Sequence, residues 1–178
     1  AGFTVLESIV AIFILSLSIS GVFTAVQRSL SQTNIAKDEV RAFYLAQEAI
    51  EIIRNKRDVN QLTKIINGPS TNWLAGISAD AADPCYFGKT CRADATGPGS
   101  VYLYSCSGGW GTCPNLKQDS GEPYMYNYST GVTTNFNREV QLESISATEI
   151  AVTVRVYWTK GLITRDFKAK THLFNWIP

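Results

Sequence analysis

The sequence predicts an α+β protein, in which one long N-terminal helix packs on a C-terminal antiparallel β-meander and a disulfide-bearing irregular loop region lies between them. Three observations support this fold class. The residues from Ser8 to Gln27 carry no charge, residues 28–57 place apolar side chains at three- and four-residue spacing, and the last third of the chain alternates apolar with polar residues. The 178 residues are enough for one domain, or for a small domain with an appendage.

The composition excludes two broad classes of protein. With 45% hydrophobic and 17% charged residues, the chain is too apolar to be intrinsically disordered. The 16 Lys and Arg against 15 Asp and Glu give a net charge of +1. The chain therefore lacks the excess of basic residues that is typical of a nucleic-acid-binding protein. The uneven placement of these charges, absent between Glu7 and Arg28, is the most informative feature of the sequence.

The uncharged run is predicted to be a helix of about 30 Å, which matches the hydrocarbon core of a bilayer. A secretory signal peptide has a shorter apolar region followed by a small-x-small cleavage site, which this run lacks. A helix buried in a soluble core is the other alternative, but the rest of the chain is not apolar enough to surround it. Ser16, Ser18 and Ser20 are compatible with lipid because a hydroxyl can bond to the carbonyl one turn earlier.

Glu7 lies at the edge of this run, where a carboxylate is costly unless a partner neutralises it. The Gly2-Phe3 junction, the glutamate four places after Phe3 and the following apolar stretch together resemble the N-terminal signature of type IV pilins and pseudopilins. The resemblance covers roughly the first 25 residues. It implies a type IV pilin-like fold, with residues 3–27 as the transmembrane or filament-core half of the helix.

The resemblance also implies a processing step and an assembly step. In that family a prepilin peptidase cuts after the glycine, here between Gly2 and Phe3, and methylates the new amino group, so residues 1–2 would be the end of a leader. The carboxylate of Glu7 would then pair with the amino terminus of a neighbouring subunit, since two charges that are costly apart become acceptable together. The alternative is that Glu7 lies at headgroup level and extends its carboxylate to water.

The expected function is that of a structural subunit, a minor pilin or pseudopilin of a type IV pilus-like or type II secretion filament. The lack of a helix-kinking proline favours a minor subunit. The expected partners are other pilin or pseudopilin subunits, the prepilin peptidase and the inner-membrane assembly machinery. The expected location is the cell membrane, as a single-pass precursor, and then an extracellular or periplasmic filament. No cofactor and no metal is expected. The alternative function is a pilin-like surface or DNA-binding tip subunit or receptor.

Residues 28–57 are predicted to be the amphipathic half of the same helix, because no Gly or Pro occurs from Val22 to Asn67. The helix is expected to end near Arg57. Its apolar stripe, which would pack on a soluble head, consists of Ile35, Ala42, Leu45, Ala46, Ala49, Ile52 and Ile53. The charged residues Glu48, Glu51 and Arg54 are assigned to the solvated face rather than to a catalytic cluster.

Residues 136–178 predict a three-stranded antiparallel meander with one apolar face. The expected strands are Phe136–Glu143, Ile150–Trp158 and Phe167–Leu173, with turns around Ser144-Ile145-Ser146 and Thr159-Lys160-Gly161. The closing run Leu173-Phe174-Asn175-Trp176 resembles the ends of PilV-type minor pilins.

Residues 58–135 form a loop-rich region with many Gly and Pro residues and two short strand candidates, Val101–Ser105 and Tyr124–Ser129. All four cysteines lie here, at Cys85, Cys91, Cys106 and Cys113. An even number clustered in an exported segment predicts disulfides. Short loops favour Cys85–Cys91 and Cys106–Cys113, although crossed pairings stay open. A zinc site is the rival interpretation, but no Cys-x-x-Cys spacing occurs.

The remaining candidate sites are weaker. An enzyme is not expected, because the only histidine, His172, alternates with lysines on a strand and has no second histidine to assist it. Three aspartates without ordered spacing, Asp80, Asp83 and Asp94, are a calcium alternative. Asn127-Tyr128-Ser129 matches a glycosylation acceptor. The candidate nucleic-acid contacts are Lys160, Arg165, Lys168 and Lys170, together with Arg155. A solvated sheet edge explains these basic residues better, so nucleic acid is the weaker candidate partner.

Overall fold

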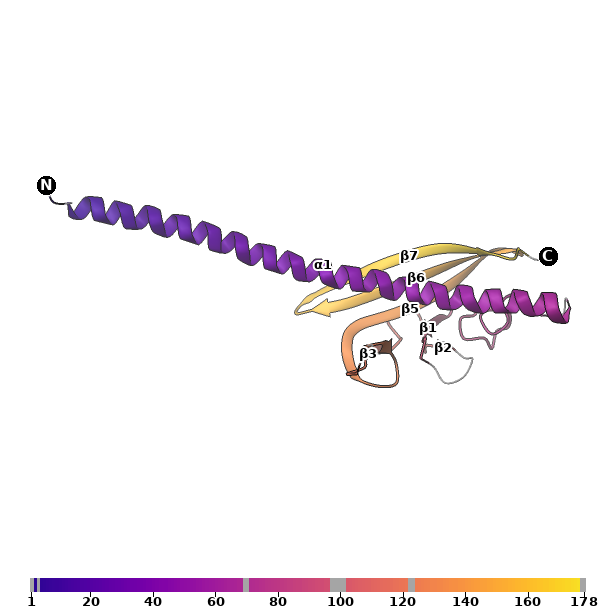
Figure 1. The fold of residues 1–178 in the computed structure, drawn as a ribbon. Helices are drawn as coiled ribbons and strands as arrows, with labels where there is room; N and C mark the ends of the chain where they lie inside the picture. Colours follow the sequence, from indigo (N-terminus) through magenta and orange to yellow (C-terminus); the bar gives the residue numbers. More distant parts are fainter. Residues whose placement is uncertain (1, 3, 69–70, 97–101, 122–123, 177–178) are drawn as a thin grey trace. The chain divides into compact units, whose positions relative to one another are not determined.

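The computed structural model describes residues 2, 4–68, 71–96, 102–121 and 124–176 (Figure 1). It contains two units, residues 1–40 and residues 41–178. The helix α1 runs from Val5 to Asn67. Its earlier part forms the first unit, and its later part forms the second unit together with a seven-stranded antiparallel sheet. The chain is therefore an α+β protein with a long N-terminal helix, as the sequence predicts.

Capping interactions define both ends of helix α1. At the start, the Oγ1 of Thr4 accepts a hydrogen bond of 3.3 Å from the backbone N–H of Glu7, which is the N-cap arrangement. At the end, Gly68 adopts a left-handed φ of 94°, and its N–H donates to the carbonyl of Lys64. The predicted end near Arg57 is therefore wrong. The helix continues to Asn67 because the first helix-breaking residues are Gly68 and Pro69.

The described residues form one sheet in which every pairing is antiparallel. Its central strand β5 pairs with β6 along one side and with both β1 and β3 along the other, while β2, β4 and β7 complete the sheet. Figure 1 shows β5, β6 and β7 as three long neighbouring strands. The strand bounds are β1 Thr90–Ala93, β2 Leu103–Ser105, β3 Asn115–Gln118, β4 Tyr126–Asn127, β5 Val132–Ser146, β6 Glu149–Lys160 and β7 Ile163–Phe174.

The predicted C-terminal meander is confirmed, and its turns lie later than expected. Strand β5 continues through the predicted turn and pairs Ser144 with Ile150 and Ser146 with Glu149, with a register shift between the two pairs. The second turn follows Lys160 and includes Gly161, which adopts a left-handed φ of 63° that favours glycine. Both strands of each hairpin are thus longer than the alternation of apolar residues indicates.

The core of the second unit lies between α1 and one face of the sheet. Five residues of the predicted stripe are buried there: Ala42, Leu45, Ala46, Ala49 and Ile53. Three of them are alanines, whose small side chains let a helix approach a sheet closely. The sheet contributes Phe136, Val140, Leu142, Ile150, Val152, Val154, Val156, Trp158 and Leu173. The alternation that predicts the meander therefore corresponds to its inward face.

The short strands were the hardest part of the sheet to predict. Strands β1 and β3 fall in the region expected to be loops, and each has only four residues. They are strands because β5 offers them backbone partners, such as Val140 for Cys91 and Val132 for Gln118. Of the two predicted candidates, one contracts to β2, with Val101 outside the described residues, and the other contracts to β4.

Candidate functional site

The described residues from 4 to 34 are all exposed, although many of them are large and apolar. The exposed large side chains are Val5, Leu6, Ile9, Val10, Ile12, Phe13, Ile14, Leu15, Leu17, Ile19, Val22, Phe23, Val26 and Leu30. The most apolar stretch of α1 has a mean hydropathy of 2.4, and α1 is long and apolar enough to cross a membrane. Water is an unfavourable environment for a surface of this size.

The polar groups inside this stretch are satisfied within the helix. The hydroxyls of Ser16, Ser18 and Ser20 donate to the carbonyls four residues earlier, at distances of 2.8 to 2.9 Å. This confirms the backbone bonding that the sequence predicts for these serines. A helix whose hydroxyls are bonded in this way presents no unpaired side-chain donor from them to lipid or to a packed helix.

Glu7 has a local role that the sequence reasoning missed. Thr4 and Glu7 stand at the N-cap and third positions of α1, the spacing of a capping box, and the Glu7 N–H bonds to the Thr4 hydroxyl. The carboxylate also lies in the first turn, where a helix favours negative charge. The Thr-x-x-Glu pattern was the signal for this role. Gly2 is exposed, and Phe3 lies outside the described residues.

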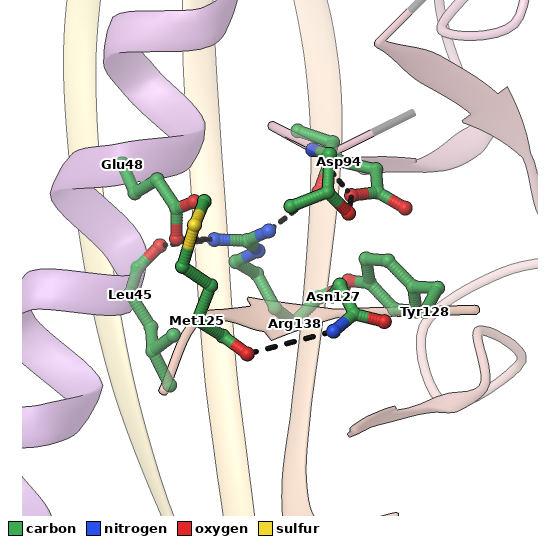
Figure 2. A network of polar contacts seen from close by, with 9 residues as sticks. Leu45, Glu48, Asp94, Met125, Asn127, Tyr128 and Arg138 are labelled. Carbon is green, nitrogen blue, oxygen red and sulfur yellow. Dashed lines mark hydrogen bonds and ion pairs between the residues drawn. The ribbon is translucent and has the colours of Figure 1, made fainter. Parts of the chain in front are cut away.

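In the second unit, a fully buried arginine joins the helix to the sheet. Figure 2 shows the guanidinium of Arg138, on β5, directed toward α1, where its Nη1 lies 2.6 Å from Glu48 Oε2 and 3.1 Å from the carbonyl of Leu45. Its Nη2 donates to the carbonyl of Ala93, at the end of β1. The assignment of Glu48 to the solvated face therefore holds only in part, because its side chain is 33% exposed and also pairs with the buried Arg138. Glu51 does lie at the surface, where it pairs with Arg54.

Tyr128 completes this network beside Arg138. Its hydroxyl donates to the Arg138 carbonyl at 3.0 Å, and the guanidinium of Arg92 lies 4.8 Å from the centre of its ring. Burial raises the pKa of Tyr128, although the charge of Arg138 opposes the shift. Burial alone would lower the pKa of Arg138, but Tyr128 and Glu48 raise it above its ordinary value. The arginine is thus held charged in the core, which is typical of a structural tie rather than a proton-transfer group.

The neighbouring residue on β5, Glu139, anchors a disulfide loop to the opposite face of the sheet. Its carboxylate is buried and accepts bonds of 2.8 Å from the Gly111 N–H and 3.0 Å from the Cys113 N–H. The side chain of Asn137 donates to the Cys113 carbonyl. A buried carboxylate without such donors would be strongly destabilising, so this contact explains an acidic residue in the middle of a strand.

Both disulfides form within short loops. Cys85 bonds to Cys91 and Cys106 bonds to Cys113, with a Cα–Cα distance of 5.1 Å in each pair. These are the pairings that the sequence favours, and the crossed alternatives are not present. Because all four thiols are used in disulfides, they do not provide the thiolates that the rival zinc interpretation requires.

Several basic residues of the terminal hairpin have acidic partners. On β7, Lys168 lies 3.8 Å from Asp166 and Lys170 lies 3.5 Å from Glu143, while Asp166 also contacts Arg155. Lys160 and Arg165 are exposed at the same hairpin. Nucleic-acid affinity depends on phosphate neutralisation by cations. The carboxylates reduce the positive potential that this surface would need, so the structure adds no support for a nucleic-acid interface.

The other polar candidates have local structural partners. His172 Nδ1 lies 2.7 Å from Glu149 Oε1 across the hairpin. Asp83 accepts backbone N–H groups of Ala79 and Asp80 and thereby stabilises a turn. Asp94 accepts from the N–H and hydroxyl of Thr96, and Asn127 accepts the N–H groups of Ser129 and Thr130. Within the described ranges, no group of three or more His, Cys, Asp or Glu residues could hold a metal ion.

Comparison with protein-family models, with curated proteins and with solved structures finds no match for this chain.

Proposed function

We propose that this chain is a structural subunit of a type IV pilus-like or type II secretion filament, a minor pilin or pseudopilin anchored and assembled through the first part of α1. The observation that carries the proposal is the exposed apolar surface of residues 5–30, which has one carboxylate, Glu7, at its beginning. Lipid would cover this surface in a single-pass precursor, and the equivalent helices of other subunits would cover it in a filament.

The remainder of the chain suits the environment outside the cytosol. Residues 41–178 form a unit with its own core and two disulfides, which persist in oxidising compartments. The precursor would hold this unit on the outer side of the cell membrane, and assembly would carry it into a periplasmic or extracellular filament. The partners would be other pilin or pseudopilin subunits, a prepilin peptidase and inner-membrane assembly machinery.

Processing provides the first test. The native protein, isolated from cells and from any filament fraction, is analysed by intact-mass and N-terminal mass spectrometry. We expect a chain that begins at an N-methylated Phe3. A filament-incorporated chain that still carries Ala1-Gly2 or longer N-terminal sequence would contradict the proposal, and so would a secreted protein cleaved within or after the apolar run.

The two roles of Glu7 can be separated by substitution. Glu7→Gln keeps a residue suited to the third position of a capping box but removes the charge, so the helix should form normally. If Glu7 pairs with an amino terminus during assembly, this variant should be processed yet lost from filaments. Ser8→Ala is the matched control, since it changes the adjacent residue without altering charge. Normal incorporation of Glu7→Gln would show that capping is the whole role of this residue.

A further inference from the structure

A groove lies on the polar face of the sheet, beside the loop that Glu139 anchors. It has a volume of about 490 Å³ and is lined by residues of β5, β6, β7 and the two disulfide loops. This volume is within the range of about 300–1,000 Å³ that is common for small-molecule sites. The lining side chains and backbone come from Phe87, Gly88, Trp110, Gln141, Leu142, Glu143, Ser144, Thr153 and Lys168.

Each of the two disulfide loops contributes one aromatic residue to this groove. Phe87 lies between Cys85 and Cys91, and Trp110 lies between Cys106 and Cys113. Both residues are half-buried, and Phe87 also packs against the hydrophobic core, which fixes its position. Two covalently closed loops from separate parts of the sequence therefore converge on one concavity, an arrangement that keeps aromatic groups in place before a ligand arrives.

The backbone on both sides of Trp110 is held firmly. The carbonyl of Gly109 accepts a bond of 2.8 Å from the Thr112 hydroxyl, and the N–H of Gly111 donates to Glu139. A loop fixed by a disulfide, a buried carboxylate and a local hydroxyl bond loses little further entropy on binding.

The strands supply polar groups to the same groove. Gln141 is paired across the strands with Thr153, and its amide nitrogen donates to Thr90 at 2.7 Å, which fixes its orientation. Glu143 and Lys168 add one negative and one positive charge to the lining. Together these residues offer carbonyl, hydroxyl, carboxylate and ammonium groups for hydrogen bonding.

We infer that this groove binds a neutral oligosaccharide. A sugar ring has an apolar C–H face, which suits the indole of Trp110, and a hydroxyl periphery, which suits the polar side chains of the strands. Glu143 and Lys168 already have ion-pair partners in Lys170 and Asp166, so the lining presents little unpaired charge to an anionic or a cationic ligand, and an apolar peptide would desolvate its polar groups. The inference goes beyond filament assembly, because every lining residue lies in residues 41–178 and the ligand does not depend on the first part of α1.

Saccharide titration of the full chain tests this inference. The protein is kept in a zwitterionic detergent, because maltoside and glucoside headgroups would compete for the groove. Maltotriose, cellotriose, N-acetylated chitotriose and a short single-stranded oligonucleotide are titrated by calorimetry and by tryptophan fluorescence. We expect saturable binding of at least one trisaccharide, with a fluorescence change. Binding of no trisaccharide, or a preference for the oligonucleotide, would overturn the inference.

Variants locate the binding in the groove. Trp110→Ala should raise the Kd by about tenfold or more and abolish the fluorescence change, whereas Trp110→Phe should keep part of the affinity. Trp176→Ala is the matched control, because Trp176 is exposed and does not line the groove. Glu143→Ala and Lys168→Ala change exposed strand positions where folding is not at risk, so they test the groove even if Trp110→Ala misfolds. Unchanged affinity in both of these variants would place the ligand elsewhere and refute the assignment.

Discussion

The guanidinium of Arg138, fully buried on β5, lies 2.6 Å from the carboxylate of Glu48 on α1, so one ion pair joins residues 90 positions apart (Figure 2). Arg138 also bonds to the Leu45 carbonyl on α1 and to the Ala93 carbonyl on β1. A single side chain thus ties the helix to two strands of the sheet. Removing Glu48 would leave the fully buried charge of Arg138 without its counter-charge, and removing Arg138 would take this donor from the Leu45 and Ala93 carbonyls.

We therefore expect Glu48→Ala to lower the free energy of unfolding by about 3 kcal/mol, because Arg138 would stay buried without its counter-charge. Glu51→Ala removes a similar carboxylate from the same helix, but the Glu51–Arg54 pair is exposed, and its loss should cost less than about 1 kcal/mol. Urea denaturation of the intact chain in detergent, followed by tryptophan fluorescence, measures both. Equal decreases in the free energy of unfolding for the two variants would show that the Arg138–Glu48 pair does not contribute more to stability than a surface pair.

The two disulfides should differ in their resistance to reduction. Cys85 and Cys91 are both fully buried, whereas Cys106 is partly exposed. Under mild reductant, we expect Cys106–Cys113 to open first, while Cys85–Cys91 persists until the second unit unfolds. Timed alkylation followed by peptide mass spectrometry identifies the order. Simultaneous reduction of both bonds at a low concentration of reductant would contradict this expectation.

Stability should fall at alkaline pH through Tyr128. Burial raises its pKa in the folded protein, while an unfolded tyrosine titrates near pH 10. The stability that the neutral Tyr128 hydroxyl contributes is therefore fully present below about pH 10. It is lost as the pH rises through the pKa of Tyr128 in the folded protein, because the unfolded chain releases the phenol proton at a lower pH. Tyr128→Phe should flatten the decline in unfolding free energy between about pH 9 and 11.

Tyr128→Phe should also lower the free energy of unfolding by about 1 kcal/mol at neutral pH, since the hydrogen bond to the Arg138 carbonyl disappears. Tyr44→Phe is the control, because it removes a tyrosine hydroxyl from an exposed position on α1. Denaturation midpoints across this pH range report both effects. An identical alkaline slope in the wild type and in Tyr128→Phe would remove Tyr128 as the cause.

Gly131 should be intolerant of any side chain. Its φ of 91° lies in the left-handed region, and an added Cβ would lie 2.2 Å from the carbonyl oxygen of Gln118 on β3. Gly131→Ala should lower the unfolding free energy by about 3 kcal/mol, because both the strain and the clash must be relieved by moving β3. Gly109→Ala, where an added Cβ meets nothing within 4 Å, should change it by about 0.5 kcal/mol or less. Similar denaturation midpoints for the two variants would disprove this account.

The long elements were predictable because their signals repeat along the chain. A stretch without Gly or Pro and with an apolar stripe indicates α1, and alternation indicates β5, β6 and β7. Boundaries were less accurate. The predicted helix end at Arg57 followed the last clear charge pattern, whereas the actual end follows Asn67, where Gly68 supplies the first favourable stop.

The candidate groove was not predictable at all. Phe87 and Trp110 stand in loops that carry no periodic pattern, and nothing in their spacing indicates that they line the same concavity. The burial of Glu139 was not predictable either, because a glutamate in the middle of an apolar strand is expected to point outward into solvent. Only the N–H groups of Gly111 and Cys113, which arrive from a distant loop, make its burial tolerable.

The features that depend on neighbours a few positions apart follow from the sequence: the apolar run after Glu7, the amphipathic stripe, the alternating strands and the preference for short disulfide loops, with crossed pairings left open. Tertiary contacts settle the pairing of the cysteines, the loops that meet and the polar residues that are buried, such as Arg138. The physical reason is that helical and strand periodicities act over a few residues, whereas a buried charge is stable only when the register of distant strands brings its partner within hydrogen-bond distance.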